Sequence, residues 1–270
     1  MLRHALIAAC AAMAVSAPAI AQAAASSAVA TPSEERPIPA HRDAAWTDIL
    51  NRYVEESADG VNRFDYGGLK ASEDDRAALD AYVASFAALD FDALSDDEQF
   101  AAWANLYNAL TIQHIIGRYP VKSIRSGYII GPWKEVKVTA DGREVSLDDI
   151  EHDILREEWD EPRVHYAVNC ASYGCPNLMN RAWRAETLDE DLDAGARAYV
   201  NHPRGVSIRR NGTLEVSTIY KWFREDFGGS KDGVVEHVLQ YADDDLAAQI
   251  RANPKITKHS YDWALNDVDT

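Results

Sequence analysis

Apolar residues recur at helical spacing in the first half of the chain. Two early segments place an apolar residue every three or four positions, which predicts an amphipathic helix over each: Trp46, Ile49, Leu50, Tyr53 and Val54, then Leu79, Tyr82, Val83 and Phe86. Ser95 with Glu98 three positions later is a capping box, so we expect a third helix to begin there and to continue to about Arg118. Gly117 and Pro120 are typical of its end.

Alternating apolar and polar positions appear later and predict two hairpins. The segments are EVKVTADGREVSL and GVSIRRNGTLEVS, with Asp141-Gly142 and Asn211-Gly212 at their centres. Both dipeptides tolerate positive φ, which suits a two-residue hairpin turn.

The segments around these hairpins alternate between helix and strand patterns. We expect a helix near Leu147–Trp159, a short apolar strand over Val164–Val168, and a helix after Thr187, where Glu190 completes a second capping box. Ser217–Phe227 predicts a strand end that runs into a short aromatic-rich helix stopped by Gly228-Gly229. Two further helical patterns follow, and ITKHSYDW closes as an extended segment. The predicted fold is α+β: a mostly helical single domain packed on a small antiparallel sheet with two hairpins.

The chain begins with the three-part pattern of a secretory signal peptide. Arg3 supplies a basic start, an Ala-rich apolar stretch follows to about Ile20, and Ala21-Gln22-Ala23 is an A-x-A cleavage signal. We expect residues 1–23 to be removed near Ala23 and the protein to be periplasmic or secreted. Residues 24–45 are small, polar and Pro-dotted, which predicts a flexible leader before a single domain over 46–270.

The charge balance narrows the partners. The chain carries 27 Lys+Arg and 44 Asp+Glu, a net charge of −17, and loss of Arg3 leaves 26 against 44, or −18. Nucleic acid and anionic lipid are bound through Lys and Arg, so we expect no nucleic-acid partner. No later apolar run is long enough for a membrane span. The partner that we expect is therefore a small molecule, a peptide or a protein.

Polar residues on otherwise apolar helices are candidates for a site. Asn105 and Asn108 lie on the third predicted helix, where buried amides need partners. They either tie this helix to neighbouring backbone, which we favour, or line a cleft. Glu151 lies beside Ile154 and is drawn toward the core, whereas His152 points elsewhere on its helix.

Cys170 and Cys175 in HYAVNCASYGCP are the two cysteines that remain after the expected cleavage. Export favours a disulfide between them, whereas a catalytic thiolate needs a base and an orienting partner. If a regular strand extends over Val164–Cys170, His165 and Asn169 face away from Cys170, so His165 cannot readily activate it and a dyad would draw on a histidine such as His152 or His114. Zinc is disfavoured because no further Cys or His pair completes a ligand set. No phosphate-binding Gly loop, G-x-S-x-G or H-E-x-x-H occurs, and we expect no cofactor.

Taken in order, six blocks resemble the domain-of-unknown-function family 547 (DUF547), over about residues 95 to 266. They are WANLYNALTI, RYPVKSI, SLDDIEHDILR, PRVHYAVNCASYGCPNL, STIYKWFREDFG and YDWALN. The resemblance marks as family-typical Asn105, Tyr107, Asn108, Glu151, His152, Arg156, His165, Asn169, Cys170, Cys175, Pro176, Trp222, Asp226, Phe227 and Trp263. It implies no established reaction. Members are exported in bacteria, and related domains occur in plant proteins and beside glutaredoxin-like modules in animals, which makes a thiol role conceivable.

These observations lead to one principal hypothesis and two alternatives. The first is a Cys-dependent hydrolase or acyl transferase acting on an amide or thiol substrate, with Cys170 as nucleophile and His152 or His165 as base. Asn105, Asn108 or Asn169 would then orient the substrate or stabilise an oxyanion, and Glu151 belongs to the same candidate set. The alternatives are a non-enzymatic binding module stiffened by a Cys170–Cys175 disulfide and a thiol–disulfide exchange protein, although Cys-x4-Cys is not the usual redox spacing.

Overall fold

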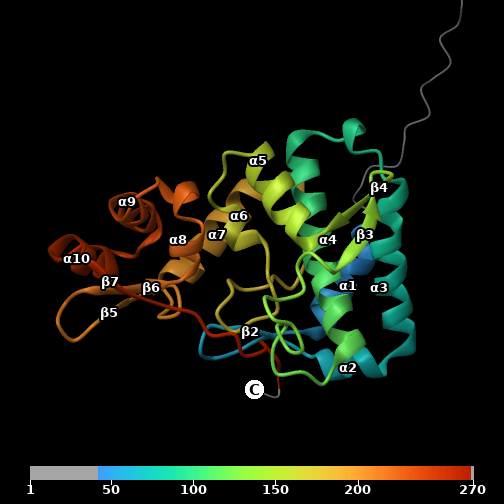
Figure 1. Ribbon diagram of the computed structural model, residues 1–270, viewed down its shortest axis with the longest axis horizontal. Helices are drawn as coiled ribbons and strands as arrows, with labels where there is room; N and C mark the ends of the chain where they lie inside the picture. Colours follow the sequence, from blue (N-terminus) through green and yellow to red (C-terminus); the bar gives the residue numbers. More distant parts are fainter. Residues whose placement is uncertain (1–41, 269–270) are drawn as a thin grey trace, which may run out of the picture. The chain divides into compact units, whose positions relative to one another are not determined.

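Helices dominate the N-terminal half of the part that the structure, a computed structural model, describes: residues 42–268. These residues all belong to one unit that extends from Ile38 to Thr270. The predicted signal peptide and all but the last residues of the predicted leader lie outside them. The helices here are α1 (Ala44–Tyr53), α2 (Tyr66–Ala71), α3 (Glu73–Ser85) and α4 (Asp96–Arg118), with 3-10 turns at Phe86–Ala88 and Phe91–Ala93 (Figure 1).

The long helix α4 is the centre of this half. Ser95 and Glu98 form the predicted capping box, in which the Ser95 backbone N–H donates to Glu98 Oε2 at 2.8 Å. Most of its side chains from Phe100 to Ile116 are buried, and α2 and α3 both pack against it. Because α4 is buried on nearly every side, its polar residues must find partners inside the protein.

The C-terminal half alternates short helices with strands. Its helices are α5 (Arg156–Glu158), α6 (Val164–Ala167), α7 (Leu188–Val200), α8 (Ile219–Trp222), α9 (Lys231–Tyr241) and α10 (Asp244–Ala252). A π-helical segment covers Asp149–Leu155, and 3-10 turns cover Ala185–Thr187 and Arg224–Phe227. The predicted stop after the aromatic-rich helix is confirmed, since Gly228 adopts the left-handed conformation at φ 81°.

The strands form three small sheets, and the predicted α+β class is confirmed. β1 (Val54–Glu56) pairs with β2 (Asn62–Phe64), and β3 (Lys137–Ala140) pairs with β4 (Arg143–Ser146), both antiparallel. The third sheet contains β5 (Val206–Ile208), β6 (Leu214–Ser217) and β7 (Ile256–Ser260). β6 is antiparallel to β5 but parallel to β7, so this sheet is mixed rather than purely antiparallel.

The two predicted hairpins both form, with different turns. Asp141 and Gly142 have φ of 52° and 68° and directly join the paired residues Ala140 and Arg143, as a two-residue turn requires. The second turn is longer than predicted. Its backbone bonds run from Arg209 N–H to the Thr213 carbonyl and from Gly212 N–H to the Arg209 carbonyl.

Two local predictions are corrected. Val164–Cys170 is not a strand: Val164–Ala167 form the single-turn helix α6, and Val168 returns to an extended conformation. A short apolar run has no periodicity that separates a strand from a buried helical turn. The Thr187–Glu190 capping box does not form, although α7 begins where expected. Thr187 Oγ1 instead donates to Asp191 Oδ2 at 2.7 Å, because the backbone at Thr187 is not extended.

The core has two parts, which meet at α6. The first contains the buried faces of α1, α3 and α4 together with Val164 and Ala167 of α6. The second contains residues of α7, α9, β5 and β6 together with Tyr166, also of α6. The correction at α6 therefore matters for function, since this turn presents consecutive side chains to both parts of the core.

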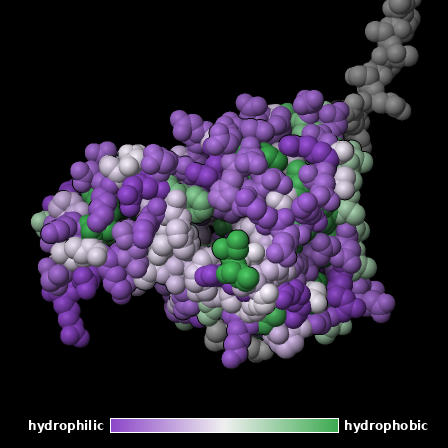
Figure 2. Space-filling model, viewed as in Figure 1, coloured by the Kyte–Doolittle hydropathy of each residue, from purple (hydrophilic) through white to green (hydrophobic). Residues whose placement is uncertain are grey.

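The chain beyond β7 returns to the N-terminal half. Phe64 of β2 bridges in parallel to Asp267, and the Phe64 N–H donates to the Asn266 carbonyl at 2.8 Å (Figure 1). The face shown in Figure 2 is mostly hydrophilic with small hydrophobic patches. Ile129 and Ile130, in the loop between α4 and β3, are the most exposed large apolar side chains of residues 42–268. No helix among the described residues is long and apolar enough to cross a membrane.

Candidate functional site

A pocket of about 680 Å³, open mouth included, lies among residues from both halves of the described chain. Its polar lining comprises Tyr107, Asp148, Glu151, His152, His165, Cys170 and Cys175. Its apolar and aromatic lining includes Trp133, Val168, Pro176, Ile219, Trp222, Phe223, Tyr261 and Trp263. The mixture of apolar walls with a few polar groups is typical of small-molecule sites.

The two cysteines are adjacent in this pocket. Cys170 Sγ and Cys175 Sγ are 2.8 Å apart, and both residues are free thiols. The Cys170 backbone N–H also donates to Cys175 Sγ at 3.1 Å. Cys175 is buried, whereas Cys170 is partly exposed. Cys170 is therefore the sulfur that a substrate in the pocket reaches first.

Asn169 fixes the loop that carries both cysteines. Its Oδ1 accepts from the Ala171 N–H and its Nδ2 donates to the Pro176 carbonyl, both at 2.8 Å. Ala171 is fully buried with φ of 59°, a left-handed conformation that is unfavourable for a residue with a Cβ atom. The two amide contacts tie the ends of the loop together and hold this turn, which brings the sulfurs into contact.

Tyr261 completes the surroundings of the sulfurs. Its hydroxyl lies 3.0 Å from Cys175 Sγ and 3.2 Å from Cys170 Sγ. The hydrogen bond to Cys175, together with burial, raises the pKa of the Cys170 thiol. Burial also opposes ionisation of Cys175, but hydrogen bonds from the Cys170 thiol, Tyr261 and backbone N–H groups outweigh it and lower the pKa of Cys175. The first proton lost by the pair therefore comes from a shared S–H···S arrangement.

Glu151 enters the pocket from the π-helical segment. It is 8% exposed, which confirms the prediction that it is drawn toward the core, and the Tyr107 hydroxyl donates to its Oε2 at 2.7 Å. Burial and the neighbouring carboxylate raise the pKa of Tyr107, which keeps its hydroxyl a donor. Within residues 42–268, Glu151 Oε1 has no hydrogen-bond partner. A π-helical insertion of this kind is frequent at functional sites, since it changes which side chains face inward.

His165 is bound to a carboxylate rather than to a sulfur. Its Nε2 lies 2.6 Å from Asp226 Oδ2, and Arg156 donates to both oxygens of the same carboxylate at 2.6 and 2.7 Å. Burial lowers the pKa of His165, and the Asp226 bond only partly opposes this effect. Burial likewise acts against the Asp226 charge, but Arg156 and His165 outweigh it and hold the pKa of Asp226 well below its usual range. The imidazole is thus neutral at pH 7 and fixed in orientation.

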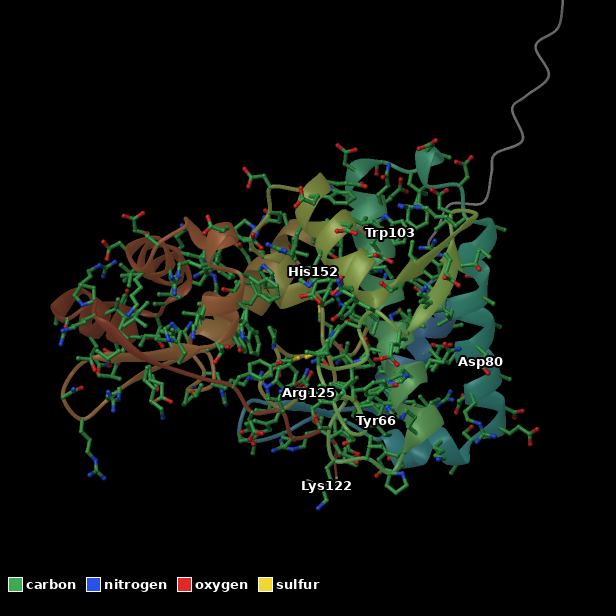
Figure 3. The ribbon with its side chains drawn as sticks, in the orientation of Figure 1. Tyr66, Asp80, Trp103, Lys122, Arg125 and His152 are labelled. Atoms are coloured by element: carbon green, nitrogen blue, oxygen red, sulfur yellow. The ribbon has the colours of Figure 1, made fainter. Side chains whose placement is uncertain are left out.

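His152 lines the same pocket from the π-helical segment (Figure 3). Its Nδ1 lies 3.0 Å from Arg156 Nη1, and its ring is 5.7 Å from that of Phe223. Phe223 in turn stacks on His165 at 4.2 Å between ring centroids. The two histidines therefore lie on one side of the pocket, with Phe223 in contact with both.

Asn105 and Asn108 tie α4 to backbone outside the pocket. Asn105 bonds both the N–H and the carbonyl of Trp183 at 2.9 Å. Asn108 accepts from the Asn169 N–H at 2.8 Å and donates to the Ala167 carbonyl at 2.9 Å. Each amide thus bonds backbone groups of another segment, which confirms the favoured prediction that the two asparagines tie this helix to neighbouring backbone. Asn108 supports the residue that precedes Cys170.

The structure therefore brings together Cys170, Cys175, His152, His165 and Glu151 and leaves the three asparagines in supporting positions. Within the described part of the chain, neither sulfur is hydrogen-bonded to a histidine. Tyr261 was not among the predicted site residues, although it begins the block YDWALN. Among residues 42–268 no group of three or more His, Cys, Asp and Glu side chains is placed to hold a metal ion.

Comparison with known proteins gives one match. Residues 91–200 match the model of a family described as "Protein of unknown function, DUF547". No curated protein and no solved structure matches the chain. The matched segment contains both cysteines, Glu151 and both histidines of the pocket.

Proposed function

This chain is a DUF547 domain-containing protein, and we propose that it performs thiol–disulfide exchange through Cys170 and Cys175 in the aromatic pocket. The observation that carries the proposal is the separation of 2.8 Å between the two sulfurs. A disulfide bond is about 2.05 Å long, so closure needs a shift of less than about 1 Å. The loop that Asn169 fixes is thus suited to alternate between dithiol and disulfide.

The exchange proceeds in two displacement steps. The pair first loses one proton to solvent, which leaves the thiolate on Cys175, the sulfur with the lowered pKa. The Cys170 proton then passes to Cys175, and the Cys170 thiolate attacks one sulfur of a substrate disulfide. The substrate S–S bond breaks, a mixed disulfide forms on Cys170, and one substrate thiolate leaves. The departing substrate thiolate takes the proton from Cys175, whose thiolate then attacks Cys170 Sγ, forms the internal disulfide and releases the second substrate thiolate, which takes up a proton from solvent. The protein loses two electrons and two protons, which the two substrate thiols carry away, and the reverse sequence oxidises a dithiol.

The surrounding groups suit this assignment. Cys170 is the more exposed sulfur and receives the substrate, while Cys175 is buried and acts second. The Tyr261 hydroxyl stabilises negative charge on either sulfur, which aids both attack and departure. We also propose, from the N-terminal sequence pattern alone, that the protein is exported, so the reaction would take place in the periplasm or outside the cell.

Cys-dependent hydrolysis or acyl transfer on an amide or thiol substrate is the second candidate. It is favoured by the contact between Asp226 and His165, which lines the same pocket, because an imidazole oriented by a carboxylate supplies the base and the orienting acid of a nucleophile–base–acid triad. Within residues 42–268, however, the hydrogen-bond partners of Cys170 Sγ are Cys175, Tyr261 and Ser172 rather than an imidazole. This chemistry therefore requires a rearrangement that exchange does not.

Redox titration with single-cysteine variants tests the proposal. We expect the wild type to convert between dithiol and disulfide in glutathione buffers, with a potential between about −120 and −270 mV, the range of known exchange proteins. Cys175→Ser should trap a mixed disulfide on Cys170, detected by mass spectrometry, and Cys170→Ser should trap far less. Exchange requires both cysteines, whereas hydrolysis or acyl transfer requires only Cys170.

Two outcomes would contradict exchange. A Cys170–Cys175 bridge with a reduction potential below about −300 mV would support the non-enzymatic binding module with a structural disulfide. Two thiols that never form an internal bridge, with amide or thioester cleavage retained in Cys175→Ser, would support the second candidate.

A further inference from the structure

One wall of the pocket is a continuous cluster of aromatic rings. Trp133 and Trp222 contact Trp263, with ring centroids 5.7 and 5.5 Å away, and Tyr261 lies 4.6 Å from the same ring. All four line the pocket, and Trp222 is 46% exposed. A large apolar ring at this exposure is available to a ligand. Aromatic faces of this kind attract cations through the ring quadrupole.

The protein itself places a cation against this wall. The Arg125 guanidinium carbon lies 4.9 Å from the centre of the Trp263 ring (Arg125 is labelled in Figure 3). The Arg156 guanidinium likewise lies 5.1 Å from the centre of the ring of Phe223, which also lines the pocket. Rings at this site thus already accept positive groups.

The charged groups that line the pocket are acidic. They are Asp148 and Glu151, and no Lys or Arg side chain is part of the lining. Asp148 contacts the exposed Lys134 at 3.4 Å, whereas Glu151 is buried with Tyr107 as its partner at one oxygen. The nearby Arg156 also interacts electrostatically with Glu151, but its hydrogen bonds to a carboxylate both go to Asp226, which offsets its charge. A buried carboxylate with one unpartnered oxygen, set in an aromatic pocket, is complementary to an ammonium or guanidinium group.

We propose that the pocket binds a cationic group of its substrate, an ammonium or a guanidinium, between Glu151 and the wall formed by Trp133, Trp222 and Trp263. The substrate class is then a thiol or disulfide that bears a positive charge near its sulfur, and this part rests on the exchange proposed above. Glu151 Oε1 accepts a hydrogen bond from the cation, and the rings replace its water. Anionic disulfides are excluded because they would bring a second negative charge to a buried carboxylate.

Three small disulfides that differ in charge test the specificity: cystamine (cationic), bis(2-hydroxyethyl) disulfide (neutral) and 3,3′-dithiodipropionate (anionic). Reduced wild-type protein is mixed with each, and formation of the Cys170–Cys175 bridge is timed by mass spectrometry. Each rate is divided by the rate of the same disulfide with dithiothreitol, which removes differences in leaving group. Measurements in about 0.3 M salt screen the overall negative charge of the protein. We expect cystamine to be favoured over the dicarboxylate at least about tenfold.

Two substitutions in the π-helical segment separate the effect of the negative charge inside the pocket from that of the protein's overall negative charge. Glu151→Gln keeps an acceptor for Tyr107 and removes the charge in the pocket, so the preference should fall to within about twofold. Asp153→Asn removes a charge from an exposed position two residues away and should retain the preference. Equal normalised rates for all three disulfides in the wild type would overturn the inference and leave exchange standing.

A second measurement does not depend on exchange. With both cysteines replaced by serine, benzylammonium, whose N–H groups can donate to Glu151, is titrated and tryptophan fluorescence is followed. We expect saturable binding that weakens about tenfold in Glu151→Gln and about fivefold in Trp222→Leu, a substitution at a half-exposed position that keeps the fold testable. Saturable binding with no bridge formation by any disulfide would overturn the exchange function alone. Absence of saturable binding, or binding that neither substitution weakens, would overturn the inference.

Discussion

His165 and Asp226, which are 61 positions apart in the sequence, meet at 2.6 Å beside the pocket, where Arg156 binds the same carboxylate. This contact joins α6 to the 3-10 turn after α8 and brings the two halves of the pocket together. It also directs the imidazole to a carboxylate instead of a sulfur. The pair therefore acts on stability and on the shape of the site.

Asp226→Asn should destabilise the fold by about 2 kcal/mol at pH 7, because Arg156 and His165 lose a shared anion. The folded-state pKa of Asp226 lies below its unfolded value, so its stabilisation is fully present above about pH 4 and is lost as the pH falls further. Urea unfolding at pH 7 and pH 3 should show the gap between wild type and variant shrinking at pH 3. Asp160→Asn, at an exposed position, is the matched control. A constant gap would contradict the assigned role.

Tyr261→Phe should make the cysteine pair less reactive. The tyrosine hydroxyl lowers the pKa of Cys175, so its loss should move the midpoint of alkylation upward by about one pH unit. The rate of reaction with iodoacetamide at pH 7 should then fall several-fold. Tyr173→Phe serves as the control, since that hydroxyl makes no hydrogen bond to either sulfur. An unchanged pH profile in Tyr261→Phe would show that the hydroxyl does not stabilise the thiolate.

Asn105→Ala and Asn108→Ala should each cost about 2–3 kcal/mol, because each leaves a buried backbone group of another segment without its partner. Their effects on the thiols should differ. Asn108 supports the backbone of Asn169 directly before Cys170, so its substitution should also slow bridge formation. Asn105 bonds Trp183 and should leave bridge formation as it is. Equal effects of the two variants on the thiols would contradict this division.

His237 should make the fold sensitive to mild acid. Burial lowers its pKa to about 4. A histidine with a depressed folded-state pKa is neutral in the fold, so stability is fully present above about pH 6.5 and decreases as the pH falls toward 4. The loss should be on the order of 2 kcal/mol. His237→Gln keeps a partner for the Tyr166 hydroxyl and does not titrate, so urea unfolding at pH 7.5 and 4.5 should show a smaller decrease. The same decrease in both proteins would assign the acid sensitivity to other groups.

Long elements with explicit end signals were predictable from the sequence. The helix α4 has a capping box at Ser95, an apolar run of many turns and a proline after its end, and all three agree. Glu151 was also predictable, since its place beside Ile154 fixes its direction on a helix.

Short elements and long-range pairs were not predictable. The four residues Val164–Ala167 complete one helical turn, and so short a run fits either period. The strand prediction placed the side chains of His165 and Cys170 on opposite faces of a strand, whereas in the structure both line one pocket. The partner of His165 depends on which element packs against α6, and no local pattern encodes that. Thr187 shows the same limit at short range, because its hydroxyl donates to Asp191 instead of capping α7.

The segment that matches the family model ends at residue 200, but the pocket does not. Trp222, Phe223, Tyr261 and Trp263 all lie beyond that limit and supply one side of the site. A fragment cut at the limits of the match would keep both cysteines and lose the tyrosine beside them, together with the carboxylate that binds His165. Relatives should therefore be aligned through the C-terminal strand before their sites are compared, because the matched segment alone lacks one side of the pocket.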